Sequence, residues 1–106
     1  MANVLIRQFD VFTNPGGTAP AYPCLVVLQS DAAALGRTVI SAPLVASARV
    51  SPSRLLPAVS VLSGAWTILL PELAPVPRRI LAERVDNLDR DRHAIVAAID
   101  LLFTGV

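Results

Sequence analysis

The side chains that could support catalysis are few, and they form no known catalytic pattern. The chain has one histidine, His93, and one cysteine, Cys24, which are too few for a structural zinc site. It contains no Walker A, dinucleotide-binding or nucleophile-elbow motif. No serine is accompanied by a base and a supporting acid. We expect His93 to be a solvated surface residue and Cys24 to pack as a small buried hydrophobe.

Carboxylates near the C-terminus are the remaining candidates for paired acid–base chemistry. They alternate with three arginines, as Asp86, Asp89 and Asp91 with Arg84, Arg90 and Arg92. Such alternation is typical of a solvated, salt-bridged helix start. An arginine-based ribonuclease using Asp31 with Arg37 or Arg49 stays an open alternative that no spacing favours. We therefore predict no enzyme activity, no metal site and no cofactor.

Charge and hydropathy narrow the choice of partner. The formal net charge is +1 without any charge block, which argues against binding nucleic acid by phosphate neutralisation. Hydrophobic residues make up 54% of the chain, yet its longest charge-free run is interrupted by proline and glycine and is unsuited to crossing a membrane. The excess apolar surface predicts a homodimer or a permanent hetero-complex. The unpaired cysteine and the lack of a signal-peptide pattern predict a cytoplasmic protein.

The pattern of apolar and turn residues predicts one domain, residues 1–106, made of short strands followed by a helix. Expected strands cover 4–13, 22–29, 38–40 and 44–46, the last two around a bend at Pro43, with a loop or single helical turn at 30–36. A hairpin is expected from 58–62 and 65–70 around Ser63-Gly64, then an edge strand within 76–81. This order predicts a mainly β (α+β) fold, a small antiparallel sheet or partly open barrel with one helix packed on it.

The last element is predicted to be an amphipathic helix over 91–103. Asp89 is the expected N-cap, and Gly105 is the expected left-handed residue after the helix. One apolar face is expected from Ile95, Ile99, Leu102 and Phe103. We expect Val106 to be held near this structured end, so that the end is either a packed plug or a presented contact surface.

Short segments along nearly the whole chain match one known family in order and spacing. They are Gln8-Phe9-Asp10-Val11-Phe12-Thr13, Gln29-Ser30-Asp31, Gly36-Arg37, Ala42-Pro43-Leu44, Ser47-Ala48-Arg49, Leu56-Pro57-Ala58-Val59, Trp66, Val76-Pro77 and Ala98-Ile99-Asp100-Leu101-Leu102-Phe103-Thr104-Gly105-Val106. Together they resemble the CcdB family of toxins from toxin–antitoxin modules. The resemblance implies an SH3-like small barrel with a C-terminal helix and a cytoplasmic homodimer. It also implies plasmid maintenance through a non-catalytic poison that binds the DNA gyrase A subunit, traps the gyrase–DNA cleavage complex and is neutralised by a CcdA-like antitoxin.

The resemblance also implies the site residues. Target contacts are expected from the helix end and from the loop after the second strand, at Asp100, Phe103, Thr104, Gly105, Val106, Ser30, Ala32 and Ala33. Contacts with the antitoxin are expected at Gln8, Arg37 and Arg49. Turn chemistry is an equal alternative for Gln8, Ser30 and Asp31, and an ordinary solvated surface role is favoured for each arginine taken singly. For Phe103, packing in the helix core or at a dimer seam is favoured over target contact, and for Trp66 core or dimer packing is expected.

This chain departs from the family at the expected contact surface. Thr104 and Val106 replace a tryptophan and an isoleucine, Asp100 replaces an asparagine, and small alanines replace bulky aliphatic residues at 32 and 33. A tryptophan at an interface centre commonly contributes about 2 kcal/mol or more to binding, and threonine has no ring to replace it. A diverged homologue that does not poison gyrase and binds another protein therefore remains the alternative function. A MazF-like ribonuclease is the third hypothesis.

Overall fold

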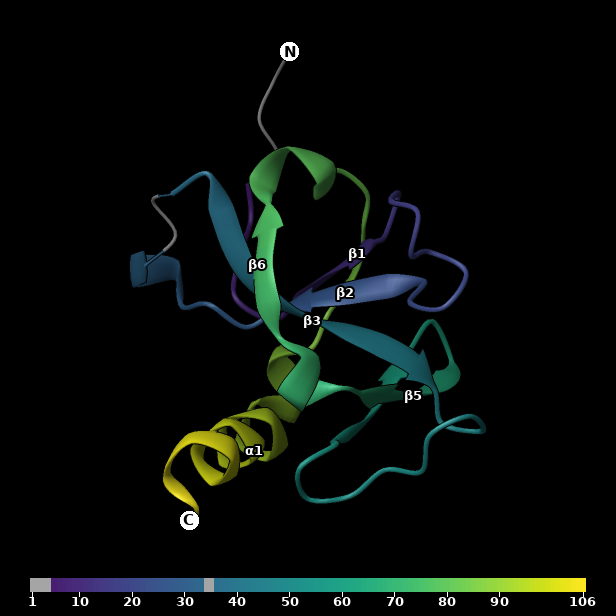
Figure 1. The fold of residues 1–106 in the computed structure, drawn as a ribbon, viewed down its shortest axis with the longest axis vertical. Coiled ribbons are helices and arrows are strands. Elements are labelled where there is room, and N and C mark those ends of the chain that lie inside the picture. The colour runs from purple at the N-terminus through teal and green to yellow at the C-terminus, as the bar shows by residue number, and fades with distance from the viewer. Residues whose placement is uncertain (1–4, 34–35) are drawn as a thin grey trace.

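A curled antiparallel sheet carries one helix at the C-terminal end of the chain (Figure 1). The computed structural model describes residues 5–33 and 36–106. The strands are β1 (Asp10–Thr13), β2 (Cys24–Val27), β3 (Thr38–Ala46), β4 (Ala58–Val61), β5 (Gly64–Ile68), β6 (Ala74–Pro77) and β7 (Arg84–Asn87). The strand order is β4-β5-β3-β2-β1-β7, and β6 pairs with β3 off this path. The predicted mainly β fold, a small half-barrel with one C-terminal helix, is confirmed.

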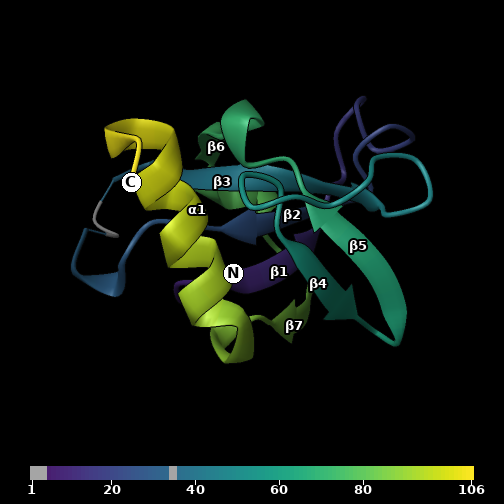
Figure 2. The ribbon, with the colours of Figure 1, turned by 90° about the horizontal axis from the view of Figure 1, so that it is seen from below.

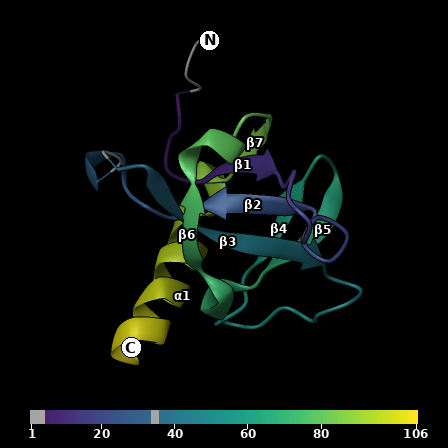
Figure 3. The same cartoon turned by 45° about the horizontal axis from the view of Figure 1, so that its top comes forward.

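The helices connect and cover the strands. They are the 3-10 turns η1 (Asp31–Ala33), η2 (Leu70–Glu72), η3 (Arg78–Ile80) and η4 (Asp89–Asp91), and the α-helix α1 (Arg92–Thr104). Figure 2 shows α1 lying across one face of the sheet, in front of β1, β2 and β3. The opposite side is crossed by β6, which Figure 3 shows in front of β2 and β3.

Two apolar clusters fill the two faces of the sheet, because successive strand residues point to opposite sides. The cluster beneath α1 contains Phe9, Val11, Val26, Leu44, Ile68, Ile95 and Ala98, among others. The second cluster contains Ile6, Phe12, Leu25, Val27, Val39 and Leu81. As a result β2 is covered on both faces, as its continuous apolar sequence predicts.

The predicted break at Pro43 is wrong, because β3 runs unbroken through the proline. The Pro43 carbonyl accepts a hydrogen bond from the Leu69 N–H, so its nitrogen faces the same side of the strand. On that side the partner of β3 changes from β6, which ends its pairing at Ser41, to β5, which starts at Leu44. The missing N–H therefore falls where no strand needs a donor.

The predicted hairpin is confirmed as β4 and β5, but its turn lies one residue earlier than expected. Val61 pairs with Gly64, which leaves Leu62 and Ser63 as the two turn residues, with φ of 49° and 67°. Gly64 is needed for a different reason. A Cβ there would lie 2.9 Å from Nε1 of Trp66, so the glycine makes room for the indole, which packs half-buried against the first cluster.

The edge strand predicted within 76–81 is confirmed only in part, because β6 begins earlier, at Ala74, and gives way to η3 at Arg78. The Arg78 N–H donates to the Arg37 carbonyl, so the backbone N–H and C=O groups of the even-numbered residues of β6 point toward β3. Pro75 and Pro77 consequently turn their nitrogens toward the open side. This edge presents fewer backbone donors than an ordinary strand does.

The prediction of a salt-bridged helix start within 84–92 is confirmed only from Asp89 onward, where η4 leads into α1 and Arg92 pairs with Asp89. Residues 84–87 form β7, which pairs with β1, and Asp89 begins η4 rather than capping α1. The position before α1 is Asp91, which makes no side-chain capping bond. Extended pairing with β1 outweighs the local charge pattern, since it lets half-buried Val85 pack on the first cluster.

The remaining expected elements are shorter than predicted. Of 4–13, only Asp10–Thr13 is strand, because Phe9 adopts a positive φ of 69° within a turn closed by the Asp10 N–H and the Arg7 carbonyl. The expected loop at 30–36 contains η1, a single helical turn. Position 4 and positions 34 and 35, also covered by those expectations, lie outside the described residues.

Candidate functional site

The C-terminal end of α1 carries two of the large apolar side chains that are exposed among the described residues, Phe103 and Val106. We call residues 100, 103, 104, 105 and 106 the docking tip. Gly105 has a φ of 78°, and its N–H donates to the Leu101 carbonyl, as predicted for a helix end. Nothing lies within 4 Å of where its Cβ would be, so conformation rather than crowding favours glycine. Figures 1 and 3 show this end at the periphery, beyond the strands.

Residues 100 and 103–106 are all exposed, so the end is not a plug packed within its own subunit. Its use as a contact surface stays a prediction. Phe103 is 67% exposed and Val106 is 83% exposed. Of the two packing roles predicted for Phe103, the helix core is wrong, and the dimer seam stays a prediction. The helix turns roughly 100° per residue, so Ile95, Ala98 and Leu102 share the face toward the sheet while Phe103 lies past its margin.

The polar groups of the docking tip make it acidic. Asp100 is exposed, and the last turn of α1 contains no basic residue. Aligned peptide dipoles add partial negative charge at a helix C-terminus. The Thr104 hydroxyl donates to the Asp100 carbonyl at 2.7 Å, so it is turned back onto the helix. The surface offered to a partner is therefore an apolar ring and an aliphatic side chain beside a carboxylate.

An apolar groove of about 330 Å³ runs from the docking tip onto the sheet. It is lined by residues of α1, of β3 and of the chain just after β2 and η2, namely Leu28, Gln29, Ile40, Leu73, Ile99 and Phe103. Sequence reasoning did not identify this groove. Its residues come from four separate segments, and only the apolar periodicity of the helix pointed toward one wall.

The loop after β2 continues from the groove wall. Ser30, Ala32 and Ala33 are exposed, as expected for contact residues. The Gln29 side chain holds the loop in place, since its amide N–H donates to the Ala33 carbonyl and its Oε1 accepts from the Ile40 N–H. The chain thus brings Gln29, at the loop, and Phe103, at the docking tip, to the same groove.

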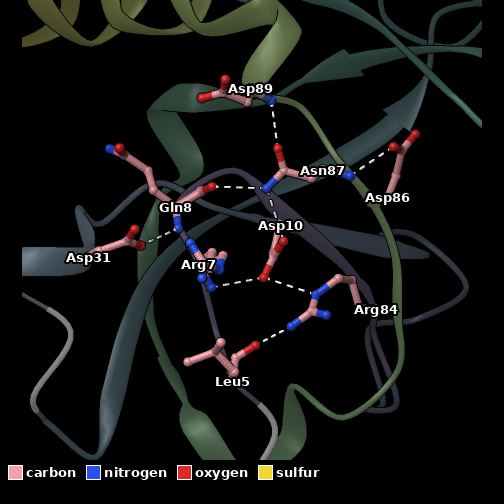
Figure 4. Close-up of polar contacts among 9 residues, drawn as sticks. All are labelled: Leu5, Arg7, Gln8, Asp10, Asp31, Arg84, Asp86, Asn87 and Asp89. Atoms are coloured by element: carbon pink, nitrogen blue, oxygen red, sulfur yellow. Dashed lines mark hydrogen bonds and ion pairs between the residues drawn. The ribbon is translucent and has the colours of Figure 1, made fainter.

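Gln8 and Asp31 are brought together, and their contacts are structural (Figure 4). The Gln8 N–H donates to Oδ1 of Asp31 at 2.8 Å, and the Gln8 side chain donates to the Leu28 carbonyl at 2.9 Å. Of the two readings predicted for Gln8, turn chemistry therefore has direct support. The carboxylate of Asp31 is engaged by this turn rather than by Arg37 or Arg49, with which it makes no ion pair within the described residues.

Arg37 and Arg49 are both exposed, but they lie at opposite ends of β3. One precedes the strand at Thr38 and the other follows its end at Ala46. A strand of this length spans roughly 30 Å at about 3.3 Å per residue. The two arginines therefore do not form one cluster.

The other singled-out residues have ordinary environments. His93 is exposed, as predicted. Cys24 is half-buried against the first cluster, and burial raises the pKa of its thiol, which agrees with a small apolar role. Among the described residues, no group of three or more metal-binding side chains comes together, and no helix is long and apolar enough to cross a membrane.

Comparison with known proteins identifies the family of this chain. A search of curated proteins found no relative. The family model described as CcdB protein matches residues 8–105, which is nearly the whole chain and includes the loop and most of the docking tip. CcdB proteins are toxins of toxin–antitoxin modules and not a family of catalytic enzymes. The match confirms the resemblance drawn from the short segments, and the chain belongs to the CcdB family.

Proposed function

We propose that this protein is the toxin of a type II toxin–antitoxin module and acts in the cytoplasm as a homodimer. In this proposal the docking tip binds the DNA gyrase A subunit and traps the gyrase–DNA cleavage complex. A CcdA-like antitoxin reverses the effect. Family membership supports the general class.

The observation that carries the gyrase proposal is the exposure of the docking tip. A side chain as apolar as Phe103 is 67% exposed, although the sheet nearby offers an apolar groove that it only borders. Leaving a large aromatic side chain in water forgoes about 1.5–3 kcal/mol of burial. Such exposure beside the acidic Asp100 suits a target surface that is apolar and basic. The exposed loop at Ser30, Ala32 and Ala33 is proposed to widen this contact.

The antitoxin is proposed to be an acidic segment that follows β3. Arg37 and Arg49 lie at opposite ends of that strand, so one extended segment of roughly ten residues would be needed to pair with both. Exposed ion pairs contribute little individually, about 0.2–1 kcal/mol each. Removing both arginines should therefore weaken antitoxin binding modestly and make it less sensitive to salt. Gln8 is proposed to contribute only by shaping the turn beneath the loop.

The test is induced expression in gyrase-sensitive cells together with a gyrase–DNA cleavage assay on purified protein. Phe103→Ala should lower gyrase affinity about 30-fold or more, as loss of an interface hot spot worth about 2 kcal/mol. Leu5→Ala is the matched control, because Leu5 is 66% exposed and is not part of the docking tip. Cleavage trapping that Phe103→Ala and Leu5→Ala reduce equally would contradict the assignment of the docking tip.

The alternative function is a diverged homologue that does not poison gyrase and binds another protein. It is favoured by one observation, that the Thr104 hydroxyl is used within the helix and presents no ring to a target. Thr104→Trp distinguishes the two. If the wild-type protein does not trap gyrase and Thr104→Trp does, the alternative is correct; if both trap gyrase, the toxin assignment stands.

A further inference from the structure

Arg90 joins two parts of the sheet that no strand pairing connects. Its guanidinium makes a two-point contact with Asp86, from Nη1 to Oδ1 at 3.2 Å and from Nη2 to Oδ2 at 3.0 Å. Nη1 also donates to the Asn87 carbonyl at 3.0 Å, and Nη2 donates to the Ser60 carbonyl at 2.5 Å. Asp86 and Asn87 belong to β7, whereas Ser60 belongs to β4.

These strands are the two ends of the sheet, since the order runs from β4 to β7. No pairing between them is present among the described residues, so the Arg90 side chain takes the place of a strand-to-strand ladder. The Leu62 N–H of the hairpin turn also helps to lower the pKa of Asp86. The Asp86–Arg90 pair thus joins β7 to the β4 edge. We call Asp86 and Arg90 the seam clasp.

The seam clasp lies directly before the helix that carries the docking tip. Arg90 is in η4, and α1 begins at Arg92. In α1, Ile95 and Ala98 are fully buried, while Ile99 and Leu102 pack half-buried against the first cluster. Burial is therefore most complete up to the middle of the helix, and the seam clasp adds a polar attachment just before its start. From Ala98 to Thr104 it extends for about 9 Å, at 1.5 Å per residue.

We propose that Arg90 is a positioning residue, which sets the direction of α1 and hence the place of the docking tip. The inference rests on the proposed function of the docking tip, but it makes a separate geometric claim. A tilt of roughly 10° at Ala98 would move residue 104 by about 2 Å. Displacements of this order are enough to weaken an interaction that depends on orientation.

The first experiment measures geometry without any target. Spin labels are attached at Ala65→Cys, an exposed position of β5, and at Thr104→Cys. Both changes are made in a Cys24→Ser background. The labelled chain is diluted into unlabelled chain so that distances within one molecule dominate. In Arg90→Gln the distance distribution should shift or broaden by about 2 Å. Arg92→Gln is the comparison variant, because Arg92 is 49% exposed against 52% for Arg90 and its partners are Asp89, three residues away, and the Phe9 ring, instead of β7 and β4.

The second measurement uses the unlabelled variants with purified gyrase. Arg90→Gln should weaken binding tenfold or more, and Arg92→Gln should not. Arg90→Lys should stay close to Arg90→Gln, because lysine cannot make the two-point contact while also reaching Ser60. Thermal unfolding of each variant verifies that the fold persists.

The outcomes separate the two proposals. An unchanged distance distribution in folded Arg90→Gln would overturn the positioning role, whatever the gyrase result. A changed distribution with tenfold weaker binding supports it. If the distribution changes while wild-type protein fails to bind gyrase, the positioning role stands and the gyrase proposal fails.

Discussion

The carboxylate of Asp10 lies 3.0 Å from Nε of Arg84, and the Asp10 side chain is only 3% exposed. This carboxylate also accepts hydrogen bonds from the Arg7 N–H and from the Asn87 side chain, at 2.8 Å and 3.0 Å. Arg84 in turn donates to the Leu5 carbonyl and lies over the Phe12 ring, as Figure 4 shows in part. One buried charge therefore fastens the N-terminal segment to β7.

Asp10→Ala should cost about 3 kcal/mol of unfolding free energy, because it leaves buried donors without an acceptor. Urea denaturation at neutral pH measures the loss. Asp89→Ala, which breaks the exposed pair with Arg92, is the control and should cost about 0.5 kcal/mol or less. Equal losses for the two variants would mean that burial of Asp10 adds nothing.

The hairpin turn offers a stabilising substitution. Leu62 and Ser63 both have positive φ, a conformation that costs ordinary residues about 1–2 kcal/mol each and that Asn-Gly adopts readily. Leu62→Asn with Ser63→Gly should raise the unfolding free energy by about 1–2 kcal/mol. Differential scanning calorimetry measures the change. A lower melting temperature would show that the Leu62 side chain stabilises the fold by more than its positive φ costs.

The seam clasp predicts a pH dependence of stability. Hydrogen bonding from the Arg90 side chain, followed by the Asn87 N–H, the Arg90 charge and the Leu62 N–H, holds the pKa of Asp86 below its ordinary value, although burial acts in the opposite sense. A depressed folded-state pKa stabilises the fold above the unfolded-state pKa. This stabilisation is lost as the pH falls through the folded-state value.

The unfolding free energy lost in Arg90→Gln should therefore be largest at about pH 7 and should become progressively smaller below about pH 4. Urea unfolding of wild type and variant across this range measures the difference. In an Asp86→Asn background the same substitution should show no such dependence. A difference that stays constant down to about pH 2 would assign the effect of Arg90 to its carbonyl contacts alone.

Gly105 allows conformation to be separated from packing at the docking tip. Gly105→Ala meets no atom within 4 Å, yet it must adopt a positive φ at a cost of about 1 kcal/mol, whereas Gly105→Asn costs less. We expect gyrase affinity to fall in the order glycine, asparagine, alanine, with little change in melting temperature. Equal binding by all three would show that the docking tip does not need the left-handed residue.

The sequence predicted elements whose cause is local. The hairpin, the left-handed Gly105 and the buried β2 each depend on a few neighbouring residues, and each is present. The wrong predictions concern segments whose structure depends on pairing with strands that are distant in the sequence. Pro43 fits inside β3 because the pairing partner of β3 changes from β6 to β5 at that position. Residues 84–87 form a strand because they pair with β1.

In the candidate site, too, features formed by neighbouring residues could be predicted and features formed by distant segments could not. The exposed residues of the docking tip were identified from the chain, since they follow the predicted helix directly. The groove beside Phe103 joins four separate segments, so no single stretch of sequence marks it. Asp86 and Arg90 belong to the charge alternation that predicts a helix start, whereas the two residues close a seam that exists only in the folded sheet.

The prolines of β6 also bear on the tendency of this protein to aggregate. Open sheet edges invite copies of a chain to stack into fibres, and apolar chains such as this one are prone to do so. Pro75 and Pro77 turn donor-free nitrogens to the outside. An added strand would find fewer backbone donors along that edge, which disfavours growth of an aggregate from it.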